Sequence, residues 1–427
     1  MPDVIQKFVG KKLLLLGTNP GTTDIINYAR SQGAWVIVTD NQPIEKSAAK
    51  QIADEAWPVS TADVDTLEKL AVQRRVNGIF AGVSEFNLEK SLTLCERLGL
   101  PFYCTRKQWE TCNNKQRFKQ LCRDNDIPVP KEYKIDTPFN SEDLRQVRYP
   151  VIVKPVDKSA GTGIRICRNE DQLLKAYPQA VSLSNDNQAV VEEFIEGDEF
   201  LAGYVIKDGE FSLSHIIDKY VNLEPGEGMS LPQAIISPSK HANRYIEELN
   251  FKVIKMFQDI GLVNGFIFIQ GLLNEKFYVF EANYRIDGLM FYRIVSKVNR
   301  INYMEMLVNH ALNSKMINYD LRLNNPKLSN KCCCGFELVS RGGVVGSIQG
   351  LEVINNKRNL FTIDKMYEVG DYIQESGTLN QVLLRFYFIE DTLQDLKNSI
   401  KEIQENVKVL DDKGTDMLLP PFDTNRI

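Results

Sequence analysis

The sequence lacks the metal-binding and phosphate-binding motifs that identify several large classes of protein. Its three histidines are not spaced with a cysteine as zinc ligands are, and its eight cysteines contain no Cys-x-x-Cys pair. We therefore predict that the cysteines are buried small apolar residues in a reducing compartment, not metal ligands or nucleophiles. Neither Gly-x-x-x-x-Gly-Lys-[Ser/Thr] nor Gly-x-Gly-x-x-Gly occurs, which argues against a P-loop site and a dinucleotide-dependent oxidoreductase.

Long apolar runs and an excess of basic residues are also missing. The apolar run near the N-terminus, Leu13 to Leu16, is far shorter than the ~18 residues that a membrane-spanning helix needs. No cationic stretch with a cleavage site precedes it, as a secretory signal would require. The net charge of −5 argues against a nucleic-acid or anionic-membrane surface. We therefore expect a cytoplasmic protein that binds neither nucleic acid nor membrane.

Hydrophobic spacing predicts a parallel α/β unit in the first part of the chain. Short apolar runs alternate there with stretches of helical spacing, a pattern typical of a parallel sheet covered on both faces. The expected strands are 12–17, 35–40 and 78–82, and the expected helices are 22–33, 63–75 and 86–98.

The sequence pattern changes after a polar helix expected at 115–125, and the rest of the chain predicts α+β structure. Gly-rich turns alternate with β-rich runs at 149–155, 163–167, 189–195, 201–206 and 211–217. A helix at 243–260 and a hairpin at 265–282 follow, and an amphipathic helix at 393–407 lies among C-terminal strands. Three domains are expected, at 1–111, 112–325 and 326–427, with a lid subdomain at about 142–205.

The strongest local motif is a strand that ends in a lysine and runs into a loop of small residues. Lys154 closes the run VIVKP, and the loop Ser159-Ala160-Gly161-Thr162-Gly163 follows. A lysine on a rigid strand and bare backbone N–H groups suit a triphosphate. An ordinary flexible turn is the alternative interpretation of this motif.

A second motif follows about 40 residues later, in the segment VVEEFIEGDEF that begins at Val190. An apolar strand runs into acidic residues around an apolar pair. Backbone groups here can bind adenine, and a carboxylate can bind the ribose hydroxyls. A strand end with solvated carboxylates is the alternative.

The third motif is a hairpin that carries oxygen ligands. Glu281 and Asn283 are two residues apart and share one face of a strand, and Gln270 lies on the partner strand. Such oxygen donors suit Mg²⁺. Arg285 continues the same face and can hold a carboxylate or phosphate through two nitrogens. The alternative is the solvated face of a half-buried strand.

Taken together, in this order and spacing, the three motifs resemble the ATP-grasp superfamily. The resemblance is closest to the branch of biotin carboxylase, the carbamoyl-phosphate synthase large subunit and the purine-pathway ligases, and it covers nearly the whole chain. It implies an ATP-grasp fold with an N-terminal parallel α/β (pre-ATP-grasp) domain and a C-terminal β-rich α+β domain.

The resemblance also assigns a role to each matching residue. Lys115 corresponds to the first nucleotide-contacting lysine, Lys154 to the lysine on the α- and β-phosphates, and Arg285 to the arginine beside the γ-phosphate. The other assignments are the phosphate loop (Ser159, Gly161, Thr162, Gly163), the adenine hinge (Glu192, Glu193, Phe194, Ile195), the ribose carboxylate (Glu199) and the metal ligands (Gln270, Glu281, Asn283).

Family membership implies ATP and Mg²⁺ as cofactors, with Mn²⁺ as a substitute, and an acyl phosphate formed from a small carboxylate and consumed by an amine. Lys219 is a candidate catalytic residue, and Asn19, Glu85, His215 and Asp218 are further candidates near the substrates. Gln270 departs from the acidic residue that many relatives carry at that position, although carbamoyl-phosphate synthases also use glutamine. A biotin-carboxylase-like ligase, a non-catalytic nucleotide-binding regulator and a homodimer stay open.

Overall fold

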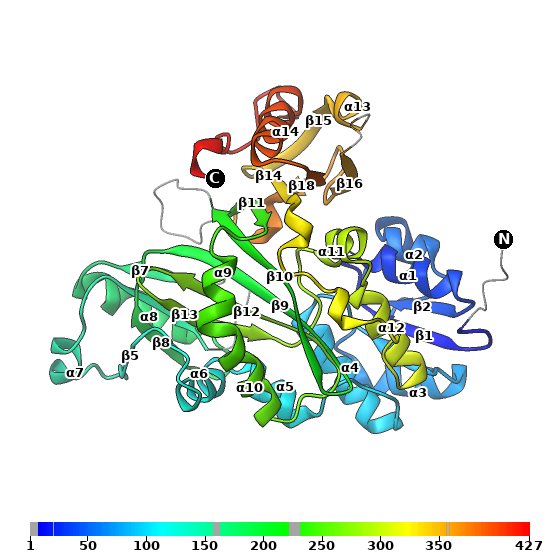
Figure 1. Cartoon of the computed structure of the whole chain (residues 1–427), viewed down its shortest axis with the longest axis horizontal. Helices are drawn as coiled ribbons and strands as arrows, with labels where there is room; N and C mark the ends of the chain where they lie inside the picture. Colours follow the sequence, from blue (N-terminus) through cyan, green and yellow to red (C-terminus); the bar gives the residue numbers. More distant parts are fainter. Residues whose placement is uncertain (1–6, 20, 157–162, 222–230, 356, 358) are drawn as a thin grey trace.

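The computed structural model describes residues 7–19, 21–156, 163–221, 231–355, 357 and 359–427 (Figure 1). These residues form a parallel N-terminal sheet and three sheets with antiparallel pairing. The predicted fold class, α/β followed by α+β, is confirmed. No helix among the described residues is long and apolar enough to cross a membrane.

The N-terminal sheet has the strand order β3-β2-β1-β4, and all its pairs are parallel. Its apolar runs are fully buried because the helices between the strands cover the sheet. Strand β3 was not predicted, because three residues carry no readable apolar run. The elements are β1 (Lys12–Leu16), α1 (Thr22–Ser31), β2 (Trp35–Thr39), α2 (Ala48–Ile52), β3 (Glu55–Trp57), α3 (Val64–Arg74), β4 (Gly78–Phe80) and α4 (Glu85–Leu98).

A four-stranded antiparallel sheet of order β5-β8-β6-β7, drawn at the left of Figure 1, contains most of the predicted lid subdomain and is called the lid sheet below. Two helices, α5 and α6, connect it to the N-terminal sheet, and α8 packs on it through its own small core. The elements are α5 (Arg106–Asn113), α6 (Lys115–Asp124), β5 (Glu132–Tyr133), α7 (Ser141–Arg145), β6 (Val151–Pro155), β7 (Arg165–Cys167), α8 (Glu170–Leu183) and β8 (Ala189–Glu193).

An eight-stranded sheet of order β13-β12-β9-β10-β11-β14-β18-β16 is the centre of the molecule. It contains strands from both sides of residue 326, so backbone pairing continues across the predicted domain boundary. The predicted helix at 243–260 is divided by a π turn at Ile246–Asn250. The elements are β9 (Asp198–Lys207), β10 (Glu210–Val221), β11 (Pro232–Ser237), α9 (Ala242–Tyr245), α10 (Phe251–Asp259), β12 (Gly265–Leu273), β13 (Phe277–Asn283), α11 (Tyr292–Asn299), α12 (Tyr303–Asn313), β14 (Cys332–Val339), β16 (Leu360–Lys365) and β18 (Val382–Glu390).

The C-terminal region adds a three-stranded antiparallel sheet of order β17-β15-β19. The apolar face of α14 is buried against the neighbouring strands, as its spacing predicts. The elements are β15 (Gly343–Gln349), α13 (Leu351–Ile354), β17 (Tyr372–Ile373), α14 (Leu393–Asn406) and β19 (Lys408–Asp411).

The cysteines behave as the sequence predicts. Seven of the eight are buried and Cys332 is half-buried. Burial raises the pKa of the Cys95 and Cys122 thiols to about 12, so both stay protonated near neutral pH. Among the described residues, no group of three His, Cys, Asp or Glu side chains can hold a metal ion.

Candidate active site

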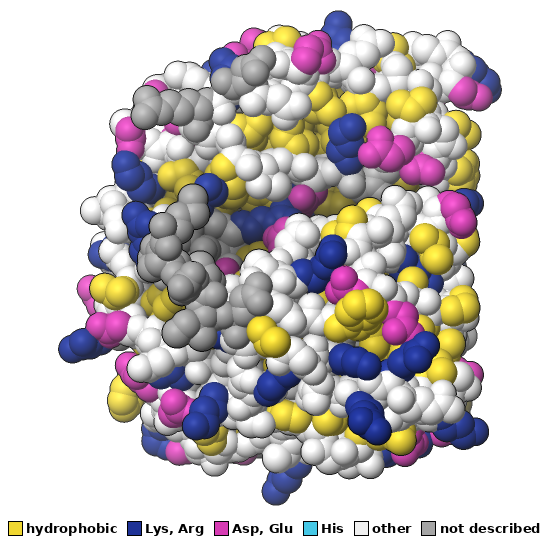
Figure 2. Space-filling model, turned by 90° about the vertical axis from the view of Figure 1, so that its right-hand side faces the viewer, with side chains coloured by type: hydrophobic (Ala, Val, Ile, Leu, Met, Phe, Trp, Pro, Cys, Tyr) yellow, Lys and Arg dark blue, Asp and Glu magenta, His cyan; other side chains and the backbone are white. Residues whose placement is uncertain are grey.

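Figure 2 shows one face of the molecule with a hollow running across it and basic and acidic side chains at its base. The lysine and hinge motifs lie on the lid sheet, whereas the oxygen ligands lie on the β12–β13 hairpin of the eight-stranded sheet. The contacts of the charged side chains show whether these motifs face one another.

Lys154 lies at the end of β6, buried on the lid sheet. Its Nζ is 2.8 Å from Oε2 of Glu192, which is itself 1% exposed. Lys119 of α6 is also fully buried and bonds to Oε1 of the same carboxylate. The β6–β8 register places Ile152 opposite Glu192, so Lys154 and Glu192 share one face of the sheet. Burial raises the pKa of Glu192, but the two ammonium groups more than offset this and lower it.

Lys115 connects this cluster to the hairpin. Asn114 caps α6 by accepting hydrogen bonds from the backbone N–H groups of residues 116 and 117, at 3.1 and 3.0 Å, which fixes the first turn. Burial lowers the pKa of Lys115, and Glu281 is the charge that most opposes this shift. Lys154 and Glu192 also act on Lys115, so one ammonium group lies in the field of both motifs.

A second contact brings the lid lysine to the hairpin. Lys154 Nζ lies 6.0 Å from the ring centroid of Phe280, the residue before Glu281. The β12–β13 register shifts between Gln270 and Gly271, so that Phe280 and Glu281 both lie beside Gln270, and the strand lysine and the hairpin ligands face a common space. We call Lys115, Lys119, Lys154 and Glu192 the lid cluster.

Part of the predicted phosphate loop lies outside the described residues, namely Ser159, Gly161 and Thr162. Gly163 is described and has φ +76°, a left-handed conformation that favours glycine. A Cβ atom there would lie 2.8 Å from Pro155 Cγ. Gly163 therefore lies against the end of the strand that carries Lys154, and a side chain there has no room.

The predicted adenine hinge is anchored by its backbone. The N–H groups of Glu193 and Phe194 donate to the carbonyls of Lys131 and Pro150, at 2.9 and 3.1 Å. Glu193 also accepts a hydrogen bond from the Lys131 N–H through its side chain, at 2.8 Å. The N–H of Ile195 makes no backbone hydrogen bond to the part of the chain that the structure describes. Ile195 is therefore the donor at this hinge that an adenine can use.

Glu199 and Lys219, predicted as ribose carboxylate and catalytic lysine, form an ion pair. They lie directly opposite each other on β9 and β10, with Lys219 Nζ 2.8 Å from Glu199 Oε2. Burial lowers the pKa of Lys219, but Glu199, then Glu337 and Glu281, raise it above its ordinary value. Lys219 is therefore an ammonium group that is surrounded by carboxylates.

The three predicted metal ligands lie together on the hairpin. Gln270 of β12 is opposite Glu281 of β13, and Asn283 donates to Glu281 Oε1 at 2.9 Å. Gln270 and Glu281 are half-buried, while Asn283 is 4% exposed. Two carbonyl oxygens and a carboxylate on one strand pair are the hard oxygen donors that Mg²⁺ prefers.

Arg285 links the hairpin to the N-terminal sheet. Its Nε is 2.6 Å from Oε2 of Glu85, the first residue of α4, and Trp109 Nε1 donates to the other oxygen at 3.0 Å. Nη2 of Arg285 lies 3.4 Å from Asn283 Oδ1. Asn19 is half-buried in the turn after β1, and its Oδ1 has no hydrogen-bond partner within the described residues.

Two further candidates, His215 and Asp218, are held by contacts within the protein core or with neighbouring polar groups. His215 is fully buried among the rings of Phe266, Phe291 and Tyr303, and burial lowers its pKa to about 4. Asp218 accepts hydrogen bonds from the Ser239 hydroxyl and the residue 240 N–H, at 2.5 and 2.8 Å. Among the described residues, neither side chain contacts the lid cluster or the hairpin ligands.

The sequence-based selection missed Lys119, although it lies four residues after Lys115 on the same helix. That i, i+4 spacing is the signal that could have found it. It also missed Glu337 and Arg385, which form an ion pair at 2.5 Å within the eight-stranded sheet. No local motif marks them, because the two residues are 48 positions apart on separate strands that only the sheet brings together.

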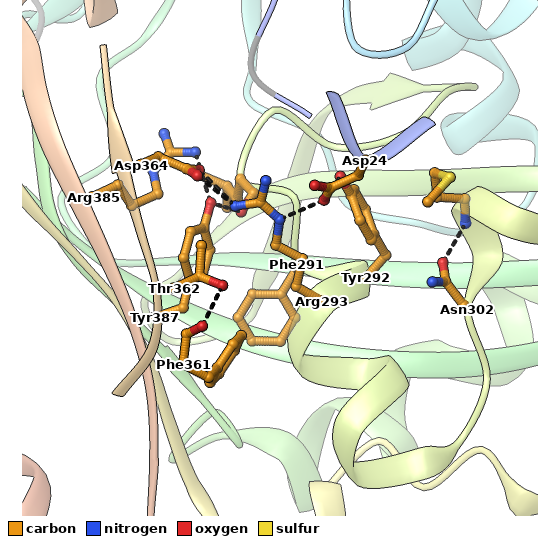
Figure 3. A network of polar contacts seen from close by, with 12 residues as sticks. Asp24, Phe291, Tyr292, Arg293, Asn302, Phe361, Thr362, Asp364, Arg385 and Tyr387 are labelled. Carbon is orange, nitrogen blue, oxygen red and sulfur yellow. Dashed lines mark hydrogen bonds and ion pairs between the residues drawn. The ribbon is translucent and has the colours of Figure 1, made fainter. Parts of the chain in front are cut away.

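Near this pair, Arg293 of α11 holds three parts of the chain together (Figure 3). It bonds to Asp24 of α1 at 2.7 Å and to both oxygens of Asp364 on β16 at 2.7 Å. Arg385 lies opposite Asp364 in the β16–β18 register. We call Asp24, Arg293, Asp364, Arg385 and Glu337 the junction cluster.

Comparison with known proteins agrees with this geometry. Residues 112–289 match the family described as ATP-grasp domain. An L-amino acid ligase from Bacillus licheniformis has a similar fold, with a TM-score of 0.78 and 17% identity, over 94% of this chain and 99% of that one. Phosphoribosylglycinamide synthetase from Anaerococcus prevotii gives 0.72 and 19%, over 94% and 99%.

A third structure contains ligands. The biotin carboxylase domain of Hydrogenobacter thermophilus 2-oxoglutarate carboxylase, solved with MgADP, ADP and bicarbonate, has a TM-score of 0.77 and 17% identity, over 93% of this chain and 90% of that one. At these identities the likeness concerns the fold. The chain therefore contains an ATP-grasp domain, at residues 112–289.

Proposed function

We propose that this protein is an ATP- and Mg²⁺-dependent carboxylate–amine ligase that activates its carboxylate as an acyl phosphate and releases ADP and phosphate. The observation that carries the proposal is the position of Lys154, whose Nζ bonds to Glu192 in the lid cluster and lies 6.0 Å from the ring centroid of Phe280, the neighbour of Glu281 on the hairpin. Surplus positive charge and oxygen ligands for a divalent cation thus face the same space. A magnesium triphosphate has the complementary charges.

The nucleotide would lie along the line from the hinge to Arg285. Adenine accepts a hydrogen bond from the Ile195 N–H, and the ribose hydroxyls bond to Glu199. Lys115 and Lys154 then neutralise phosphate oxygens. Glu192 would not touch the nucleotide with its side chain, because Lys119 and Lys154 already occupy both of its oxygens.

Gln270, Glu281 and Asn283 fit a magnesium ion by the chemistry of their donors, and Mn²⁺ could replace it. When bound, the ion would neutralise charge on the phosphate oxygens. The single carboxylate among the three ligands leaves room for phosphate oxygens to complete the binding. These residues would therefore bind the metal with the nucleotide more tightly than the metal alone.

The chain's own residues can bring about phosphoryl transfer by position and charge. The substrate carboxylate would lie between Arg285 and the N-terminal sheet, where Glu85 bonds to Arg285. Arg285 holds the attacking oxygen near the γ-phosphorus, and Lys115 and Lys154 stabilise the charge that develops there. The amine then attacks the acyl carbon in its neutral form, its surplus proton goes to solvent, and phosphate leaves.

A carboxylating reaction is the second candidate, because bicarbonate is bound in one of the structures with a similar fold. It differs in the acceptor, which would be a biotin carrier and not a small amine. A regulator that binds nucleotide without turnover is the third. Bicarbonate-dependent ADP release would favour the second candidate, and ATP binding without any ADP release would favour the third.

Hydroxylamine trapping tests the proposal directly. The protein would be incubated with ATP, Mg²⁺ and pools of small carboxylates, and hydroxamates formed from an acyl phosphate would be detected by mass spectrometry. We expect a hydroxamate and matching ADP release with one pool. ADP release without any hydroxamate would reject the acyl phosphate.

A further inference from the structure

Glu337 has one carboxylate oxygen that the structure leaves without a partner. The residue is 1% exposed and lies directly opposite Arg385 in the β14–β18 register. Two nitrogens of Arg385, Nε and Nη2, lie 2.6 and 2.5 Å from the same oxygen, Oε1. Oε2 is buried and accepts no hydrogen bond from the described residues. Because arginine commonly pairs with both oxygens of a carboxylate, this geometry leaves Oε2 for another donor.

The sheet places Lys219 on the same face as this oxygen. Lys219, Ile235 and Gly335 form one row across β10, β11 and β14, and Glu337 is two residues beyond Gly335. From the strand spacing and the rise per residue, the Lys219 and Glu337 Cα atoms are roughly 12 Å apart. Four methylene groups on the lysine and two on the glutamate can close such a gap.

Gly335 leaves a gap in the row beside Glu337, although Ile235 lies between Gly335 and Lys219. A Cβ atom at Gly335 would meet Ile235 and Tyr387 at 3.9 Å, an ordinary van der Waals distance. Glu337 is also one of the carboxylates that raise the pKa of Lys219. The ammonium group and the Glu337 carboxylate are therefore close enough to interact electrostatically, and a hydrogen bond between them requires the lysine side chain to extend past Ile235.

The present partner of Lys219 is the residue that the nucleotide needs. Lys219 Nζ bonds to Glu199 Oε2, and Glu199 is the proposed ribose carboxylate. Ribose hydroxyls that bond to both oxygens of Glu199 would compete with the ammonium group for Oε2. The Glu337 side of the face lies beside the segment after Arg285, because Arg385 Nη1 donates to the carbonyl of Gly288 at 2.8 Å.

We propose that Glu337 is a positioning residue for Lys219. When the ribose occupies Glu199, the Lys219 ammonium moves its hydrogen bond to Oε2 of Glu337 and is held toward the Arg285 end of the site, where the phosphoryl group is transferred. Only hydrogen bonds are exchanged in this step. The inference rests on the proposed function, since it requires a bound nucleotide and a reaction near Arg285.

Kinetics of Glu337→Gln, Lys219→Met and the double variant test the proposal. We expect Glu337→Gln to lower kcat about tenfold or more while the KM for ATP changes less than about threefold, and Lys219→Met to lower kcat about 100-fold. Because Glu337 acts through Lys219, the double variant should be no slower than Lys219→Met. Multiplied losses in the double variant, or an unchanged kcat in Glu337→Gln, would overturn the proposal.

Asp364→Asn is the matched control, because Asp364 is the other carboxylate opposite Arg385. Its kcat should stay within about threefold of wild type. An equal loss in this variant would assign the effect to the Arg385 surroundings in general and reject a specific role of Glu337.

A crystal structure of the wild-type protein with Mg²⁺ and β,γ-methylene-ATP tests the same step without any variant. We expect Lys219 Nζ within about 3.2 Å of Glu337 Oε2. An active wild-type enzyme with Lys219 still on Glu199 in this complex rejects the positioning role alone. The expected exchange in a protein without carboxylate-dependent ADP release rejects the proposed ligase reaction alone. Absence of nucleotide binding rejects both.

Discussion

The lid cluster and the junction cluster are both built from buried charges, but they differ in sign. In the lid cluster Lys119 and Lys154 bond to the fully buried Glu192 and Lys115 lies in its field, while Lys119 also bonds to the less buried Glu132 at 3.0 Å. In the junction cluster two guanidinium groups meet three carboxylates, and Arg293 is bonded on both sides, to Asp24 and to Asp364 (Figure 3).

The difference shows which cluster awaits a ligand. Buried charges of one sign repel each other, so surplus positive charge in the lid cluster is stabilised when an anion arrives. In the junction cluster, Arg293 joins α1, α11 and β16 and is satisfied without a ligand. Its remaining negative charge is on Glu337, which is suited to bind a cation. We therefore expect the lid cluster to bind an anionic ligand and the junction cluster mainly to hold the domains in place.

The largest effect should follow from removing the single buried carboxylate of the lid cluster. Glu192→Leu leaves Lys119 and Lys154 without their buried partner, and we expect the free energy of unfolding to fall by about 3–5 kcal/mol. Urea denaturation measures this. Saturating Mg·ATP should restore part of the stability, because it supplies negative charge and binds only the folded state. Glu193→Gln, one residue away and less buried, should cost less than about 1 kcal/mol.

The second prediction concerns turnover. Lys154→Ala and Glu281→Ala should each lower the rate of ADP release at least ~100-fold, because both residues would act on charge that develops in the transition state. The exposed turn of the same hairpin offers the controls Lys276→Ala and Glu275→Ala, which should keep nearly normal rates. Normal rates in Lys154→Ala and Glu281→Ala would contradict the assignment of both residues.

A third variant tests the junction cluster. Arg293→Met removes the cation between Asp24 and Asp364, and we expect a loss of about 2–4 kcal/mol in the free energy of unfolding. Unlike the loss in Glu192→Leu, this loss should not be recovered selectively by Mg·ATP. Lys297→Met, an exposed residue one turn further on α11, should change stability by less than about 0.5 kcal/mol. Selective rescue of Arg293→Met by nucleotide would remove the distinction between the two clusters.

The smallest effect is a pH dependence that belongs to the lid cluster. The pKa of Glu192 is lowered in the folded protein, so its ionised form favours the folded state. This contribution is complete above the ordinary glutamate pKa of about 4.3 and is lost as the pH falls through the lower, folded-state value. Denaturation midpoints between pH 7 and pH 3 should show this loss in wild type. A Glu192→Gln variant with the same acid profile as wild type would contradict it.

The predicted fold class was readable because its signals are local. The run Leu13–Leu16 and the spacing of α14 depend on neighbours along the chain, and burial of an apolar face follows from that pattern. The short strand β3 and the π turn within 243–260 were not readable. Three residues give no periodicity, and a π turn changes the hydrogen-bond step without changing the composition.

The candidate site likewise contains residues that local spacing identified and residue pairs that are distant in the sequence. Lys154, Glu281 and Asn283 were identified from spacing within single strands, and they stay predictions as ligands until the variants are measured. The Arg285–Glu85 pair joins residues 200 positions apart, and the Glu337–Arg385 pair joins two strands that only the sheet brings together.

Local patterns along the chain predict the order of the elements, the ATP-grasp motifs and the types of side chain available for a magnesium triphosphate. The fold is needed to show that Lys119 shares Glu192 with Lys154, that Lys219 is held by Glu199, and that one oxygen of Glu337 has no partner among the described residues. The difference comes from the distance along the chain over which each effect acts. Backbone periodicity acts over a few residues, whereas the energy of a buried charge depends on every charge within several ångströms, whatever its place in the chain.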